Sequence, residues 1–150
     1  MLPGWADDSL DDALRGTRAM AIVLAVAGVA TVLYWVTFFT SGDVQATTER
    51  CYLVFERAFP AADAWAAASA LIAAEALWRR RPRAVLFTIA AGSAYVFLGL
   101  MDILYNLENG MYAVHTAEMA AEIAINLTCL TVGPAAIAVA WRARHALDRR

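Results

Sequence analysis

Four long apolar stretches make up most of the chain and constrain its fold more than any other feature. They cover residues 19–39, 60–78, 84–105 and 119–141. A helix of about 20 residues, rising 1.5 Å per residue, crosses the hydrocarbon core of a bilayer. Lipid offers the backbone no hydrogen-bond partners, so each stretch should be α-helical. The sequence predicts an all-α integral membrane protein, a bundle of four transmembrane helices in one membrane domain over residues 1–150.

The segment between the first two apolar stretches has a different character. Residues 44–59 are amphipathic, with Cys51 and three aromatic side chains on one side of an expected helix. This pattern is typical of a helix that lies on a membrane surface. Pro60 follows at the start of the next stretch, where proline suits the first turn of a helix. We therefore expect an extracytoplasmic interfacial helix over about 44–59, between spans one and two.

The basic residues predict an orientation. All twelve are arginines, and with four crossings ten of them fall on one side of the membrane, leaving only Arg50 and Arg57 on the other. The positive-inside rule then places both termini and the 79–83 loop in the cytoplasm. The first 18 residues are acidic, unlike a cleavable signal, so the first span is expected to stay as an anchor. The composition, rich in arginine and alanine and without lysine, favours a bacterial inner membrane.

Polar side chains recur at helical spacing in the last two spans. Asp102 and Asn106 are four residues apart, and Glu118, Glu122 and Asn126 continue that spacing in the fourth span. Residues four apart share one face of a helix. A short turn joins the two spans, so we expect them to be antiparallel neighbours, with Asp102 and Glu122 at similar depth.

Three further charged residues are expected at the same level. Glu108 lies in the connecting turn, Asp63 lies near the start of the second span, and Arg57 lies in the interfacial segment. A carboxylate at membrane depth must pair with a cation, share a proton or face water. These residues predict an acidic cavity in the outer half of the bundle. Alternatively, Arg50 or Arg57 could fold back and neutralise Asp102 or Glu122, which would make the acids structural.

A second spacing pattern concerns possible metal ligands. Met111, His115 and Met119 are four residues apart and would align on one face if the segment were helical. Thioether and imidazole ligands suit copper(I). Methionine is also an ordinary core residue, so this trio is a minor candidate and no metal site is predicted. No CxxC pair, glycine-rich phosphate loop or matched haem histidines indicate a particular cofactor, and the cofactor stays unassigned.

These features favour a small membrane protein whose acidic cavity binds or moves a cationic solute, a metal ion or a proton. Its expected partners are the lipid bilayer and a small cationic or lipidic ligand, and nothing indicates nucleic-acid binding. Four spans leave little room for a path through one chain, which favours a homodimer.

One alternative is an enzyme using acid catalysis on a lipid or isoprenoid, with an apolar tunnel that opens to lipid and ends at the acids. Another is a non-catalytic subunit or assembly factor, with the acids paired to arginine.

Overall fold

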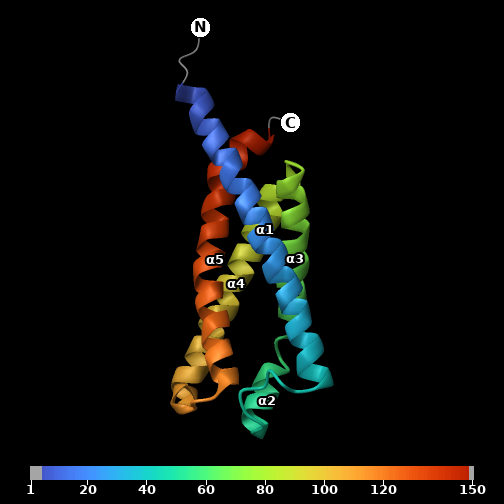
Figure 1. Cartoon of the computed structure of the whole chain (residues 1–150), viewed down its shortest axis with the longest axis vertical. Coiled ribbons are helices and arrows are strands. Elements are labelled where there is room, and N and C mark those ends of the chain that lie inside the picture. Colours follow the sequence, from blue (N-terminus) through green and yellow to red (C-terminus); the bar gives the residue numbers. More distant parts are fainter. Residues whose placement is uncertain (1–4, 149–150) are drawn as a thin grey trace.

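The computed structural model describes residues 5–148, with side chains described over 16–147. The described chain is all helical, as predicted. Its elements are α1 (Trp5–Thr40), α2 (Arg50–Glu56), α3 (Pro60–Trp78), α4 (Arg83–Glu108), the 3-10 turn η1 (Met111–Ala113) and α5 (Ala117–Asp148). Four of these helices are long, and α2 is a short helix beside one end of the bundle (Figure 1).

Three of the long helices are long and apolar enough to cross a membrane, as expected for an integral membrane protein. They are Gly16–Thr40 within α1, Arg83–Glu108 (α4) and Ala117–Leu147 within α5. The fourth long helix, α3, is less hydrophobic because ten of its 19 residues are alanine and two are acidic. A methyl side chain contributes little apolar surface, so the composition of α3 alone does not identify it as a span.

The long helices alternate in direction along the bundle (Figure 1). The beginning of α1, the turn between α3 and α4, and the end of α5 lie at one end of the bundle, called here the loop end. The α2 helix and the connection between α4 and α5 lie at the opposite end, called here the α2 end. Helix α1 packs mainly on α3 and less on α5, while α4 packs on both α3 and α5.

The predicted interfacial helix is much shorter than expected. Only Arg50–Glu56 is helical, whereas residues 44–49 form no helix and residues 57–59 form a turn into α3. The prediction of a helix over 44–59 was therefore wrong in extent. Two threonines and a valine lie in the non-helical part, and β-branched side chains lower helix propensity. The backbone N–H of Ala46 instead donates to the hydroxyl of Tyr52, 3.2 Å away, and this contact ties the loop to α2.

Small residues bring α4 and α5 into close contact. A Cβ atom added to Gly133 would lie 2.8 Å from the carbonyl oxygen of Gly92 and 2.7 Å from Cγ2 of Val96. A Cβ added to Gly99 would lie 2.9 Å from Cβ of Cys129. Small residues allow helix backbones in membranes to approach in this way. Helix α5 continues without a break through Pro134. Its close contact with α4 aligns Asn106 of α4 with Glu122 of α5.

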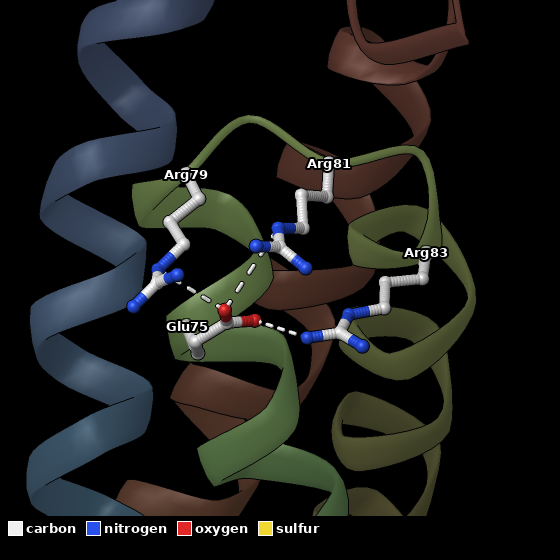
Figure 2. Close-up of polar contacts among 4 residues, drawn as sticks. All are labelled: Glu75, Arg79, Arg81 and Arg83. Atoms are coloured by element: carbon white, nitrogen blue, oxygen red, sulfur yellow. Dashed lines mark hydrogen bonds and ion pairs between the residues drawn. The ribbon is translucent and has the colours of Figure 1, made fainter.

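An ion-pair cluster joins α3 to α4 at the loop end (Figure 2). Glu75 Oε1 lies 3.1 Å from Nε of Arg79, which is four residues further along the chain. Arg81 and Arg83 also contact the Glu75 carboxylate, at 3.9 Å and 2.5 Å. The cluster is largely exposed, so its contribution to stability is small. It nevertheless orients the short arginine-rich turn between the two helices.

Candidate functional site

A cavity of about 520 Å³ lies among α1, α4 and α5, and α2 and α3 reach it near the α2 end of the bundle. Most of its wall is apolar, with Leu98 from α4 and several aliphatic residues from α1 and α5. Some of these wall residues are also on the bundle surface, since Ile22, Val26 and Ile125 are 56%, 64% and 41% exposed. The cavity therefore extends from the interior to the face of the bundle that lipid would cover.

Four acidic side chains line this cavity, each from a different helix: Glu56, Asp63, Asp102 and Glu122. All four come from the parts of α2, α3, α4 and α5 that lie toward the α2 end. The apolar wall continues from them toward the middle of the bundle. The site is thus amphipathic, with a carboxyl cluster at one end and a hydrocarbon-like chamber beyond it.

Three of the four carboxyl groups receive hydrogen bonds from the protein. Asn106 Nδ2 donates to Glu122 Oε1 at 2.6 Å, and the Tyr52 hydroxyl lies 3.5 Å from Glu122 Oε2. The indole N–H of Trp35 donates to Asp63 Oδ2 at 2.8 Å. The Tyr34 hydroxyl donates to Glu56 Oε2 at 3.4 Å. Such donors offset part of the cost of keeping a carboxyl group away from water.

Asp102 is the exception within the part of the chain that the structure describes. It lines the cavity and is only partly accessible, yet no hydrogen bond or ion pair to its carboxyl group occurs among these residues. A buried or half-buried carboxylate without a partner is unfavourable in a low-dielectric setting. Asp102 is therefore the acid in this cavity with unused capacity for a ligand.

Glu56 and Tyr52, both in α2, have raised pKa values. Burial, followed by the nearby charges of Asp102 and Glu122, raises the pKa of Glu56 to about 8. Burial likewise raises the pKa of the Tyr52 hydroxyl above its usual range, so this group stays a donor toward Glu122. This raised pKa favours the protonated form of Glu56 at neutral pH.

The arginines expected near the acids lie elsewhere. Arg50 and Arg57 are exposed, and neither forms an ion pair with a cavity acid in the described chain, where the ion pairs gather around Glu75. Arg57 was a candidate ligand-binding residue, but it does not line the cavity. The alternative in which a guanidinium neutralises Asp102 or Glu122 is therefore not the arrangement that the structure shows.

The other predicted site residues occupy varied positions. Asn106 is fully buried and contacts Glu122, whereas Glu118 is half-buried and Glu108 is exposed, and neither lines the cavity. Asn126 is 2% exposed, and neither atom of its amide group has a hydrogen-bond partner among the described residues. Of the predicted set, Asp63, Asp102 and Glu122 share the cavity, with Asn106 directly behind Glu122.

The methionine and histidine trio does not align on one helical face. Met111 lies in η1, His115 lies in a non-helical and exposed linker, and Met119 lies in the first turns of α5. The helical alignment fails because Gly110, at φ 64°, follows the end of α4 and breaks the helix there. Met111 and Met119 pack together with Tyr52 in a small apolar cluster. Within residues 16–147, no group of three or more His, Cys, Asp or Glu side chains could hold a metal ion.

Four cavity-end residues were not predicted as part of a site: Tyr34, Trp35, Tyr52 and Glu56. The tyrosine and tryptophan of α1 were consistent with an interfacial aromatic belt, which gave no sign of a polar role. One available signal was the spacing of Tyr52 and Glu56, which are four residues apart and so share one face of α2. That face is buried, because Tyr52 and Glu56 are 1% and 7% exposed.

Comparisons with protein-family models, curated proteins and solved structures gave no match for this chain. The cavity and its lining side chains are therefore the features that indicate a function.

Proposed function

We propose that this protein binds a lipid-like cation, with the hydrocarbon chain of the ligand in the apolar chamber and its positive head beside Asp102. The observation that carries the proposal is the unpartnered Asp102 carboxyl group in a cavity whose other three acids already have donors. A positive head would supply the missing partner, and the apolar wall would shield an alkyl or prenyl chain.

The chemistry of the wall favours such an amphiphile over a small hydrated ion. Apart from the carboxyl cluster, the cavity is lined mainly by aliphatic and alanine side chains, which offer a hydrated ion no ligands. The lipid-facing wall residues also support entry from the bilayer, where an amphiphile would already be dissolved.

We further infer that α3 is a fourth membrane span. It packs along α1 and α4, and its eight most buried residues are alanine, serine and leucine. An alanine-rich helix can be accommodated in a bilayer when its neighbours cover it. With four crossings the loop end, which carries the arginines of the 79–83 turn, lies in the cytoplasm, and the α2 end is extracytoplasmic.

The test is direct binding of dodecyltrimethylammonium, which combines one permanent positive charge with one alkyl chain. The protein is reconstituted in lipid nanodiscs, and binding is measured calorimetrically after subtraction of empty nanodiscs. We expect Asp102→Asn to weaken binding at least tenfold. The matched control Asp43→Asn, at an exposed acid outside the cavity, should bind like the native protein. Equal affinity for the native protein and Asp102→Asn would refute the site.

The chamber itself is tested by filling it. Ala30 lines the cavity on α1, and Ala68 is an exposed alanine on α3 that does not. Ala30→Phe should reduce binding of the same probe, because its ring occupies space needed by the alkyl chain, whereas Ala68→Phe should not.

A second candidate function is proton transfer to an isoprenoid lipid, favoured by the protonated Glu56 in the same cavity as Asp102. Glu56 would add its proton to a carbon–carbon double bond, and Asp102 would remove a proton from the neighbouring carbon of the resulting cation. The product is an isomer of the substrate, and the two acids exchange protonation states. Deuterium in farnesol recovered after incubation in D₂O, absent with Asp102→Asn, would distinguish this activity from binding alone.

A further inference from the structure

The position of Glu56 suggests that the proposed site does more than bind a cation. Its side chain is 7% exposed, although it belongs to the short helix α2 near the end of the bundle. The titratable groups around it come from every long helix and from α2 itself: Tyr34, Tyr52, Asp63, Asp102 and Glu122. None of these groups is basic, so nothing among them compensates a negative charge on Glu56.

This environment controls whether Glu56 carries a proton. Burial and the charges of Asp102 and Glu122 give Glu56 its raised pKa of about 8, so the group is mainly protonated at pH 7. A cation placed beside Asp102 would act in the opposite direction. It would cancel the repulsion that Asp102 exerts on an ionised Glu56, and it would attract the Glu56 carboxylate itself.

We propose that a cation binding at Asp102 displaces the proton held by Glu56, so that the cavity exchanges one proton for one lipid-like cation. This inference depends on the proposed function, because it requires the cation to occupy the Asp102 site. The proton leaves the Glu56 carboxyl group for water or a buffer base at the α2 end, and the carboxylate left behind shares the charge of the ligand with Asp102. The net charge of the occupied cavity is then unchanged.

Exchange has a defined pH dependence. Below the pKa of Glu56, each bound cation must displace a proton, so affinity should rise about tenfold per pH unit. Above about pH 8 the proton is already absent from the free protein, so affinity should level off. By contrast, simple binding to a cavity whose acids keep one protonation state over this range would give an affinity that does not change with pH.

The experiment counts protons released per bound cation. Dodecyltrimethylammonium, which cannot itself titrate, is added calorimetrically at pH 7 to the protein in nanodiscs. The titration is repeated in phosphate and imidazole buffers, whose protonation enthalpies differ. We expect the native protein to release close to one proton per bound cation. Glu56→Gln should lower that number toward zero, whatever its affinity, because the amide cannot ionise.

The control is Glu49→Gln, which removes an exposed acid just before α2 and should release as many protons as the native protein. Native binding without proton release, or Glu56→Gln releasing as many protons as the native protein, would overturn the exchange and leave the binding proposal intact. No binding of the probe would refute both. The affinity of the native protein between pH 5 and 9 tests the exchange independently of any variant, and a flat profile would contradict it.

Discussion

At the scale of single residues, the carboxyl groups of the cavity differ in what they can do. Glu122 has a close amide donor and a tyrosine hydroxyl nearby, so its charge is supported from within the bundle. Asp102, one helix away, has no such support among the described residues. The two acids are therefore not interchangeable: Glu122 belongs to the framework of the site, and Asp102 is available to a ligand.

Loss of the donor to Glu122 should therefore affect stability. Asn106→Ala removes the amide that lies 2.6 Å from Glu122 and leaves a half-buried carboxyl group without its nearest partner. We expect the free energy of unfolding, measured by SDS titration from mixed micelles, to fall by about 1–3 kcal/mol. Asn109→Ala is the control, since Asn109 is exposed and donates only to the carbonyl of Tyr105. Equal losses for both variants would contradict this role of Asn106.

At the scale of the elements, the contact between α4 and α5 sets the geometry of the site. Gly92, Gly99 and Gly133 allow the two backbones to approach closely along the middle of both helices. The same contact brings Asn106 opposite Glu122 one or two turns nearer the α2 end. A shift of one helix along the other would separate that pair, so tight packing in the middle maintains the polar arrangement at the end.

An alanine at Gly133 should disturb this contact. Its Cβ atom would lie 2.8 Å from a backbone oxygen of α4, which cannot move as a flexible side chain could. We expect Gly133→Ala to destabilise the protein by about 1–3 kcal/mol in the same unfolding assay. Gly16→Ala provides the comparison, because nothing lies within 4 Å of its added Cβ and alanine favours a helix by up to about 1 kcal/mol. A stability gain at both positions would show that the α4–α5 contact is not tight.

At the scale of the whole molecule, the sequence predicted the features that follow from local periodicity. Apolar runs of span length predicted the long helices, and the four-residue spacing of Asp102 with Asn106, and of Glu122 with Asn126, predicted which side chains share a helix face. The role of Glu56 could not be predicted in this way. The four-residue spacing of Tyr52 and Glu56 indicates that they share a face of α2, but their burial depends on the distant helices that cover that face, including α1 at Tyr34 and α5 at Glu122.

The orientation of the whole bundle is the remaining prediction, and the two native cysteines provide a means to test it. Cys51 is exposed on α2. It is labelled in a Cys129→Ser variant, in which the second native cysteine cannot react. If the α2 end is extracytoplasmic, a membrane-impermeant maleimide should label Cys51 in intact bacterial cells expressing the protein. In a Cys51→Ser, Cys129→Ser background, Pro82→Cys places a thiol at an exposed position of the arginine-rich turn. That thiol should react only after the membrane is disrupted, and labelling of Pro82→Cys but not Cys51 in intact cells would reverse the assigned orientation.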